Sequence, residues 1–424
     1  MHFLLLNQTF YPDELATSQQ LLDLSRFLIR EGHRVSVIAD SRGYENRKLR
    51  HPAFETFETF EGIEIHRVYS SGFGKKRIAL RLMDALTFDL SLLIKLVFFP
   101  KVDYVVSFTS PPLVGFIGVL YAKLKKVKSV QWLMDINPEI AVVVGYLKKN
   151  SLITRLLTAV FEYSVKNSER IVVLDRWMKK KIEPLLSENQ KAVVVHPWSV
   201  VKSQERSIDF KDSVFRKENK LENKFIVLFS GNHSIGHPLD TLLQSALQLK
   251  NDPSIAFVFV GSGVRTSDVA EFKAKHHLNN ILQLPLQRRE ILSDMLKSSN
   301  LHVIVMGNHL SGLMHPSKIY SILATGRPYL FIGPREGHVP DIIQQCPYGF
   351  FADHGEVNKV ISTLETVKKY QAGDYQEVAT YNPAYVTKHF SIETSLGAFL
   401  SAMEMDDSGT VIPIKKDFVA SKHS

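Results

Sequence analysis

Short apolar runs alternate with helical patterns along most of the chain. Residues 3–7 form a continuous apolar run, as in a strand buried within a parallel sheet. Thr17 and Ser18 can cap the helix that follows, which ends at Gly32. Further strands are predicted at residues 34–38, 63–68, 104–108, 129–133 and 171–174. This alternation is typical of a doubly wound parallel sheet.

A charged stretch from residue 202 to 223 interrupts the alternation, and a second series follows it. Its strands are predicted at residues 225–229, 256–260, 281–284, 301–305 and 329–332. Because 424 residues exceed one ordinary core, we predict two domains. Their ranges are 1–200 and 224–384, joined by a linker over 201–223. After irregular residues 381–384, a last helix over about 385–404 can return to the first domain, and residues 405–424 are predicted to be a disordered tail.

The segment from Leu82 to Phe99 is strongly apolar and follows a basic stretch, residues 75–81. Asp84, Asp89 and Lys95 interrupt it, so it is not expected to span a bilayer. Two interpretations remain open. One is a buried helix of the first domain, which the pattern favours, and the other is an amphipathic helix on a membrane surface.

Basic residues are concentrated in the first half of the chain. The net charge is +9, and residues 1–200 contain 28 Lys and Arg against 20 Asp and Glu. Clusters such as 75–77, 123–128 and 179–181 are either solvated surface or contacts for an anionic partner. Nucleic acid is not expected, because no recognised binding motif accompanies the charge. The single cysteine, Cys346, and the lack of a secretory-signal pattern fit a reducing, cytoplasmic setting.

The first strand lacks the signature of a dinucleotide-binding domain. That signature requires a glycine-rich turn after the strand, whereas residues 7–12 contain no glycine. Gly261 and Gly263 follow a later strand, but an isolated G-x-G is more often a tight turn. Two doubly wound domains in tandem instead favour a ligand in the cleft between them.

The run from His315 to Pro328 combines helix-boundary residues with cations. Pro316 can occupy the first helical turn, and Gly326 is typical of a helix end. Ser317 and Lys318 would then lie at a helix start suited to an anion such as a phosphorylated ligand. An ordinary helix with one solvated lysine is the alternative, and spacing alone does not separate the two.

Several segments of the chain resemble a known family, the retaining GT-B glycosyltransferases of the family-4 type. The similarity extends over residues 1–404 and is greatest to the N-acetyl-fucosamine transferase-like branch of O-antigen and exopolysaccharide biosynthesis. It rests on the segments 7–18, 135–139, 230–233, 239–243 and 316–320. The fold that it implies is α/β, with two tandem Rossmann-like domains facing a central cleft. The second domain would bind the nucleotide-sugar donor and the first the acceptor.

The resemblance also implies which residues bind the donor. The loop at Gly231 and Asn232 would let backbone amides approach the diphosphate, and Lys318 would stabilise charge on the leaving phosphate. His233 and His237 lie in the same loop and are either ligands or incidental. The remaining donor-binding candidates are Leu286, Gln287, Gly312, Leu313, Met314, Ser317 and Ser321. Arg327, at the far end of the helix, is expected to be structural.

The chain departs from the family at two carboxylates. The common pattern has glutamates spaced E-x7-E, and the matching positions here are Leu313 and Ser321. Sugar contacts would then come from elsewhere, such as the backbone of residues 312–314. The departure leaves the donor sugar open.

In the first domain, Asp135 follows a strand and would face the cleft, with Glu139 one helical turn away. Asp135 could hydrogen-bond the donor sugar or orient the acceptor hydroxyl, and the alternative is a helix cap near Pro138. Thr17 and Ser18 could meet the diphosphate at the same mouth. No metal and no other cofactor is expected, because carboxylates and histidines do not cluster at ligand spacing.

These expectations define a glycosyltransferase on the cytoplasmic face of the plasma membrane. It would transfer a sugar from a nucleoside-diphosphate donor, with UDP favoured, to a polyprenyl-diphosphate-linked saccharide. The basic first domain would face the anionic membrane surface. A UDP-sugar 2-epimerase of the same fold and a catalytically silent binding homologue remain alternatives.

Overall fold

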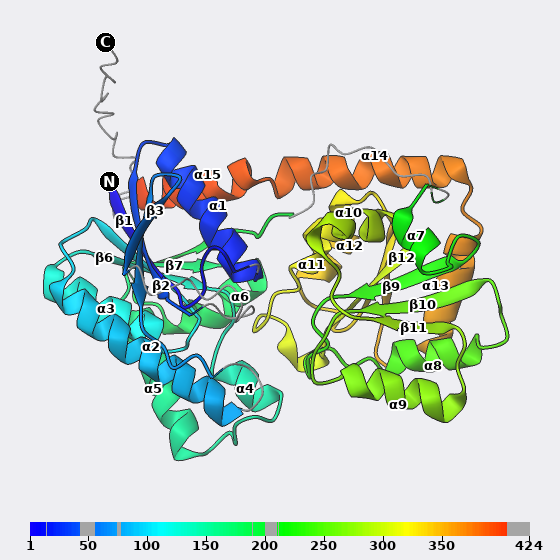
Figure 1. The fold of residues 1–424 in the computed structure, drawn as a ribbon, viewed down its shortest axis with the longest axis horizontal. Helices are drawn as coiled ribbons and strands as arrows, with labels where there is room; N and C mark the ends of the chain where they lie inside the picture. Colours follow the sequence, from blue (N-terminus) through cyan, green and yellow to red (C-terminus); the bar gives the residue numbers. More distant parts are fainter. Residues whose placement is uncertain are drawn as a thin grey trace, which may run out of the picture. The chain divides into compact units, whose positions relative to one another are not determined.

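The computed structural model describes residues 1–13, 15–42, 56–73, 78–188, 190–199, 210 and 212–404. The chain divides into two compact units (Figure 1). Unit 1 contains Met1–Val195 and the chain from Ser395 onward, and unit 2 contains His196–Thr394. The predicted tail, the predicted linker as far as residue 209 and the basic residues 75–77 lie outside the described residues.

Unit 1 contains an eight-stranded sheet in the order β3-β4-β2-β1-β5-β6-β7-β8. Its strands are β1 (His2–Leu6), β2 (Arg34–Asp40), β3 (Phe57–Phe60), β4 (Ile63–Val68), β5 (Tyr104–Phe108), β6 (Lys128–Leu133), β7 (Arg170–Val173) and β8 (Lys191–Val194). All neighbours are parallel except β3, which pairs antiparallel with β4. The order reverses between β1 and β5, so the loops after these two strands border the topological switch point.

Helices cover the sheet of unit 1 and bury its apolar strands. They are α1 (Ala16–Arg30), α2 (Ile78–Phe98), α3 (Val114–Lys125), α4 (Glu139–Val143), α5 (Leu152–Lys166) and α6 (Arg176–Ile182), with a 3₁₀ turn at Glu183–Leu185. Phe88 and Leu92 of α2 join Leu4, Leu6 and Val105 of the strands in one buried cluster. The central strands β1, β2 and β5 are buried on both faces apart from the first residues of β1 and β2, because helices flank the sheet on both sides.

Helix α15 (Ile392–Glu404) completes the core of unit 1 from its Ser395 onward. The Phe399 ring is fully buried and stacks on Trp132 at 5.1 Å between centroids. Tyr104 Oη donates a 2.6 Å hydrogen bond to the carbonyl of Met403. Residues far apart in the sequence therefore share one core.

Unit 2 contains a six-stranded parallel sheet in the order β11-β10-β9-β12-β13-β14. Its strands are β9 (Phe225–Ser230), β10 (Ile255–Val260), β11 (Ile281–Leu284), β12 (Leu301–Val305), β13 (Tyr329–Ile332) and β14 (Gly349–Ala352). Its helices are α7 (Val214–Glu218), α8 (Asp240–Gln248), α9 (Thr266–His276), α10 (Arg289–Lys297), α11 (Lys318–Ala324), α12 (His338–Ile343), α13 (Val357–Lys368) and α14 (Ala372–His389), with a 3₁₀ turn at Asn308–Leu310. The switch point lies between β9 and β12.

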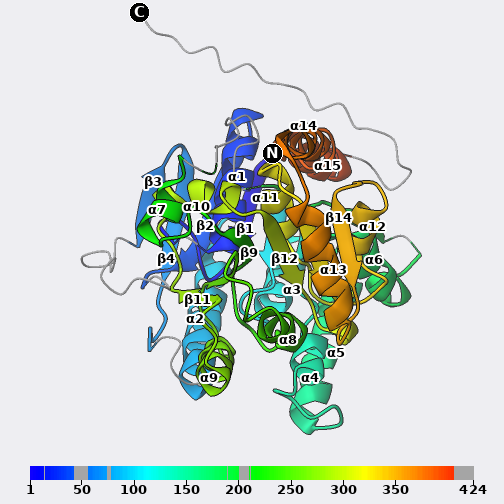
Figure 2. The same cartoon turned by 90° about the vertical axis from the view of Figure 1, so that its right-hand side faces the viewer.

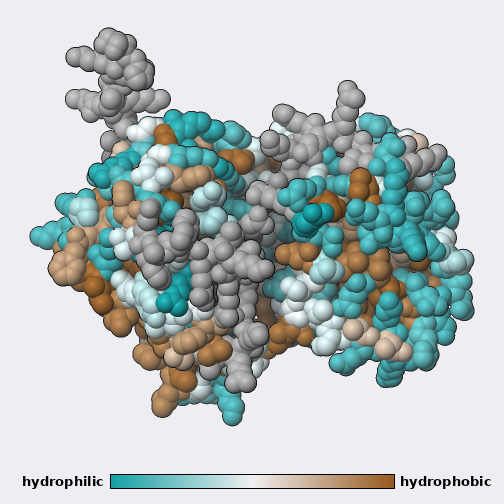
Figure 3. Space-filling model, viewed as in Figure 1, coloured by the Kyte–Doolittle hydropathy of each residue, from teal (hydrophilic) through white to brown (hydrophobic). Residues whose placement is uncertain are grey.

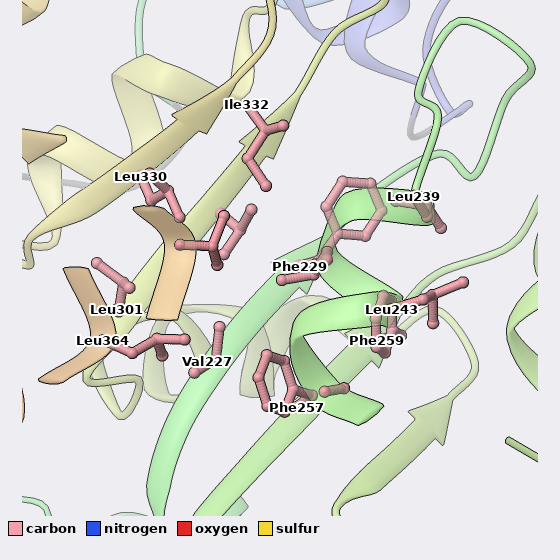
Figure 4. Close-up of a cluster of buried hydrophobic side chains, with 14 of the residues drawn as sticks. Val227, Phe229, Leu239, Leu243, Phe257, Phe259, Leu301, Leu330, Ile332 and Leu364 are labelled. Atoms are coloured by element: carbon pink, nitrogen blue, oxygen red, sulfur yellow. The ribbon is translucent and has the colours of Figure 1, made fainter. Parts of the chain in front are cut away.

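Phenylalanines dominate the core of unit 2 where β9 and β10 meet. Phe229, Phe257 and Phe259 are fully buried with Leu239 and Leu243 of the neighbouring loop and helix (Figure 4). Phe229 is the penultimate residue of β9, so its ring connects this core to the loop that follows the strand.

Two sequence predictions about unit 2 are wrong. Residues 212–223 were assigned to the linker, but they fold into unit 2 as α7 and its flanks. Arg216 is buried and donates to the carbonyl of Ser298 and to Asn300 Oδ1. Residues 381–384 were expected to be irregular, but they continue α14, which contains Pro383 and packs on α11. Packing against distant segments stabilises α7 and the continuation of α14, and the local sequence carries no signal of this packing.

Candidate functional site

The loops after β9 and β10 interlock through glycines. A Cβ on Gly261 would lie 1.9 Å from the carbonyl oxygen of Gly231, and one on Gly263 would lie 2.4 Å from that of His233. Both glycines also have a positive φ, 137° and 155°. The amide of His233 donates to the carbonyl of Ser262 at 2.9 Å, which fixes one loop on the other.

Lys318 lies against the first of these loops. Its ammonium nitrogen is 4.3 Å from the centre of the Phe229 ring, and a Cβ on Gly231 would lie 3.4 Å from it. This nitrogen is buried and has no hydrogen-bond partner among the described residues. Desolvation lowers the pKa of Lys318 to about 8. An unpaired, water-excluded ammonium group favours an incoming anion.

The potential around Lys318 is positive. Desolvation, together with the Lys318 charge, lowers the pKa of His233, and the same causes with His233 and Arg265 lower that of His237 to about 3. The His233 ring is fully buried, and neither ring nitrogen has a hydrogen-bond partner among the described residues. His237 Nδ1 lies 2.7 Å from Ser234 Oγ, within hydrogen-bond distance. Both histidines are therefore neutral, and the uncompensated charge near them is cationic.

Helix α11 differs from its predicted form at its start. It begins at Lys318 with Ser317 as the N-cap, so Pro316 lies outside the helix rather than in its first turn. Ser317 is exposed and makes no side-chain cap hydrogen bond. The helix has only seven residues, so its dipole adds little to the lysine charge. Its end is as predicted, because Gly326 follows it with a φ of 66°.

The other donor-binding candidates in unit 2 are spread over two loops. Gly312, Leu313 and Met314 follow the 3₁₀ turn after β12, and the amides of Leu313 and Met314 bond the carbonyl of Leu310. Leu313 is buried and Ser321 is half-buried in the middle of α11. The second loop follows β11 and contains Leu286 and Gln287, with Leu286 65% exposed. Gln287 donates to the carbonyl of Pro285.

Arg327 has the structural role expected from the sequence. It is buried, donates to the carbonyl of Lys297 at 2.7 Å and lies over the Phe210 ring at 4.4 Å. These contacts tie the end of α11 to the end of α10.

Asp135 is one of three carboxyl groups of unit 1 whose pKa burial raises, together with Asp40 and Asp89. It lies two residues beyond β6, at the carboxyl end of the sheet, and is half-buried. Desolvation raises its pKa to about 7. The cap of α4 is Pro138, without a side-chain hydrogen bond, so the capping alternative for Asp135 is wrong. A carboxyl group that titrates near neutrality can exchange a proton with a substrate hydroxyl.

The other candidates in unit 1 are less free to bind a ligand. The N-cap of α1 is Leu15, so neither Thr17 nor Ser18 caps the helix as predicted. Thr17 Oγ1 lies 3.4 Å from Thr9 Oγ1. Ser18 is buried, and its hydroxyl has no hydrogen-bond partner in the part of the chain that the structure describes. Glu139 pairs with Lys181 at 2.7 Å rather than standing free near Asp135.

Sequence reasoning missed two parts of this site. Gly261 and Gly263 were set aside as a simple turn, although the G-x-G spacing after β10 was visible. Arg265 was not considered; its buried Nε has no hydrogen-bond partner among the described residues, and its charge acts on His237. Its only sequence signal is its position two residues after Gly263.

Two cavities of the described structure lie away from the candidate site residues. One, of about 240 Å³, is lined by His2 and Arg34, the first residues of β1 and β2, and by His66 of β4. Another, of about 500 Å³, lies beside the start of α13. In the described part of the chain, no three His, Cys, Asp or Glu residues are grouped to hold a metal ion. The prediction that no cofactor is needed remains a prediction.

Comparison with known structures gives the class of fold. The chain has the GT-B fold, with TM-scores of 0.71 to a sucrose-phosphate synthase from Thermosynechococcus elongatus and 0.68 to Anabaena HepE in complex with UDP and glucose. Each alignment covers 95% of this chain, and 98% and 99% of the known structures, at 12% and 13% identity. A third similar structure is WaaG, a glycosyltransferase of lipopolysaccharide biosynthesis, at a TM-score of 0.66 and 14% identity, covering 93% of this chain and 98% of WaaG.

Two curated relatives are similar in sequence. The probable glycosyltransferase WbjE of Pseudomonas aeruginosa is 25% identical over 58% of this chain and 62% of its own length. The putative colanic acid biosynthesis glycosyl transferase WcaI of Escherichia coli K12 is 28% identical over 49% of this chain and 51% of its own length. The match thus spans about half to three fifths of these relatives. No family model matches the chain.

Proposed function

We propose that this protein is a retaining glycosyltransferase of bacterial surface-polysaccharide biosynthesis. It transfers a sugar from a nucleoside-diphosphate donor, UDP-linked in the favoured case, to a saccharide carried on a polyprenyl diphosphate. The reaction takes place on the cytoplasmic face of the plasma membrane. The observation that carries the proposal is the buried ammonium group of Lys318 beside the Gly231 loop, which has no hydrogen-bond partner among the residues that the structure describes. Relatives named as glycosyltransferases support it, as does a similar structure that binds UDP and glucose.

Lys318 acts on the leaving group. When the bond between the anomeric carbon and the β-phosphate oxygen breaks, negative charge develops on the diphosphate. The Lys318 ammonium, already stripped of water, stabilises that charge without reorganisation. Backbone amides of the loop at Gly231 and Asn232 add further donors, because a glycine lets the diphosphate approach closely.

The acceptor hydroxyl attacks the same carbon while its proton passes to the departing phosphate oxygen. The new glycosidic bond forms on the face from which the diphosphate leaves, so the anomeric configuration is retained. Asp135 orients the acceptor hydroxyl or a donor-sugar hydroxyl as a hydrogen-bond partner. Its pKa of about 7 lets it accept or donate near neutral pH.

The missing glutamate pair requires another set of sugar contacts. Leu313 is buried and apolar, so it makes no polar contact with a sugar hydroxyl. Main-chain groups of residues 312–314 and the exposed Ser317 hydroxyl are the candidates that remain near Lys318. Backbone contacts accept several hydroxyl arrangements, which leaves the donor sugar to be found by experiment.

Incubating the purified protein with UDP- and GDP-sugars, with and without a polyprenyl-diphosphate saccharide, tests this function. Transfer that depends on the lipid acceptor, with product of retained configuration, is the expected result. Epimerisation without acceptor would replace the proposal by a UDP-sugar 2-epimerase. Nucleotide-sugar binding without turnover of any donor would replace the proposal by a catalytically silent homologue. This alternative is motivated by Leu313 and Ser321, which stand where the family has its two glutamates.

A further inference from the structure

Helix α2 is apolar on two opposite faces. Its inner face, with Phe88, Leu92 and Leu96, is buried in the core of unit 1. Its outer face carries eight exposed large apolar side chains: Leu82, Met83, Leu86, Leu90, Leu93, Ile94, Val97 and Phe98, the last 83% exposed. A surface helix of a globular protein normally presents polar residues there. An apolar face of this length marks an interaction site.

A second exposed apolar group lies on α4 and α5. It consists of Val143 at the end of α4, Tyr146 in the connection that follows, and Leu152, Ile153 and Leu156 in the first turns of α5. Helix α3 packs against both α2 and α5, so the two groups belong to one side of unit 1 (Figures 1 and 2). The space-filling view shows apolar surface over these helices (Figure 3).

Basic residues border this apolar surface. Lys125 donates to the carbonyl of Val97 on α2, and Lys123 donates to Tyr163 Oη on α5 at 2.8 Å. Lys148, Lys149 and Arg155 are exposed beside Leu152. The two carboxylates of α2 point the other way, because Asp84 and Asp89 are each only 6% exposed. The carboxylates of α4 and α5, Glu139 and Glu162, each pair with a lysine, so the border has a net positive charge. The outer face of α2 carries no carboxylate among the described residues.

We propose that the outer faces of α2, α4 and α5 dock unit 1 on an anionic lipid bilayer. The helices would lie in the plane of the interface, with aliphatic side chains among the acyl chains and the basic border on the lipid phosphates. No helix of the described residues is long and apolar enough to cross the bilayer. A lipid surface fits better than a protein partner, because the exposed side chains are mostly aliphatic and the charge along the border is net positive.

The position of this surface suits a lipid-linked acceptor. Helix α2 comes after β4, and α4 follows β6 and Asp135, so both begin on the carboxyl-end side of the sheet. Docking would bring that edge close to the headgroups from which the acceptor saccharide extends. This last point rests on the proposed function, but the docking itself does not.

Sedimentation of the full chain with vesicles tests the docking. Vesicles of phosphatidylethanolamine and phosphatidylglycerol should bind the protein, phosphatidylcholine vesicles should bind it weakly, and added salt should reduce binding to the anionic vesicles. The double variant L90S/I94S removes two exposed aliphatic side chains, so binding should fall by about tenfold or more. Replacing Lys148 and Lys149 by Gln should lower binding about tenfold and reduce its salt dependence.

V214S is the matched control, because Val214 is an exposed aliphatic residue of unit 2, and its binding should equal that of the unaltered chain. Melting curves and nucleotide-sugar binding in solution should be the same for all these variants, which separates docking from failure of the fold or of the proposed chemistry. Equal vesicle binding by L90S/I94S and the unaltered chain would overturn the proposal. So would a dimer in solution that L90S/I94S dissociates, with no binding to vesicles.

Discussion

The two units share one scaffold but place opposite charges at the carboxyl ends of their strands. Unit 1 has Asp135, a carboxyl group whose desolvation raises its pKa to about 7. Unit 2 has Lys318, an ammonium group whose desolvation lowers its pKa to about 8. Each is an ionisable group whose pKa shift has desolvation as its cause, with no counter-charge from the described residues. The difference shows that a doubly wound sheet determines where a ligand site lies, at the carboxyl ends of the strands. The residues that follow the strands determine the charge of the ligand group that the site can bind.

Removing the Lys318 charge gives the largest expected effect. The variant K318A should lose about 10²–10³-fold in turnover, with a marked loss of nucleotide-sugar affinity, because we propose that the ammonium group contacts the diphosphate. Calorimetric titration with UDP-sugars and a transfer assay measure the two quantities. The control is K275A, an exposed lysine of α9, which should behave as the unaltered chain. Unchanged affinity and turnover in K318A would remove the diphosphate assignment from unit 2.

The glycine contact in unit 2 gives the next effect. In G261A the new Cβ would collide with the carbonyl of Gly231, and the residue would have to keep a φ of 137°. We expect a loss of about 2–4 kcal/mol in unfolding free energy and weaker donor binding. The control G397A changes a helical glycine that has no neighbour within 4 Å, so it should stabilise slightly. Denaturant titrations measure both, and equal stability of the two variants would show that the loops are not interlocked.

Desolvation of Lys318 and of Asp135 should make the stability of the protein depend on pH in opposite directions. Lys318 has a pKa near 8 when folded and about 10.5 when unfolded, so its charge costs stability below pH 8, and the cost disappears as the pH rises to 10.5. K318M should therefore stabilise the unliganded protein by about 1–3 kcal/mol at pH 7. The benefit should fade at high pH.

For Asp135 the sign is reversed. Its pKa rises from 3.8 to about 7 on folding, so the carboxylate costs stability above pH 7, and the cost disappears as the pH falls toward 3.8. D135N should stabilise the protein at neutral pH but not in acid, while slowing transfer more than it weakens donor binding. Unfolding free energies measured across this pH range check both variants. A loss of stability in either would mean that its charge has a partner within the fold.

Glu139 gives the smallest effect. Its pairing with Lys181 is about half exposed, so E139Q should change the unfolding free energy by less than about 0.5 kcal/mol. A matched K181Q variant breaks the same pair from the other side and should have the same small effect. If Glu139 contacts the acceptor as the sequence suggests, E139Q alone should raise the KM for the acceptor. Equal acceptor kinetics in the two variants would remove Glu139 from the site.

The sequence predicts most strands because each is a short run rich in β-branched and other apolar residues, and many are buried on both faces. The bounds of β4, β5, β11, β12 and β13 agree with their predicted ranges. It does not reveal the polar strand β3 at the edge of the sheet, or α7, whose Arg216 is buried by residues about 80 positions further along. Edge strands and long-range hydrogen bonds leave no periodic signal.

The candidate site was predictable where one residue type carries the chemistry. Lys318 and Asp135 follow from their positions after strands, but desolvation of their charged groups depends on the packed neighbours. Gly261 and Gly263 are needed because an added Cβ would lie 1.9 and 2.4 Å from carbonyl oxygens of the neighbouring loop, a close approach that no local spacing encodes. For Thr17 and Ser18 the local cap rule fails, because α1 begins at Ala16 after Leu15.

The packing of α15 onto unit 1 has a consequence for biosynthesis. During translation, residues 1–195 of unit 1 leave the ribosome first. The core of unit 1 lacks Phe399 and the Tyr104–Met403 hydrogen bond until residues 395–404 have also been translated, after all of unit 2. Nascent unit 1 therefore keeps Trp132 and Phe3 without their last partner while some two hundred further residues are translated. Completion of the first-made half is thus coupled to synthesis of the last helix, so a prematurely terminated chain would be left open to proteolysis.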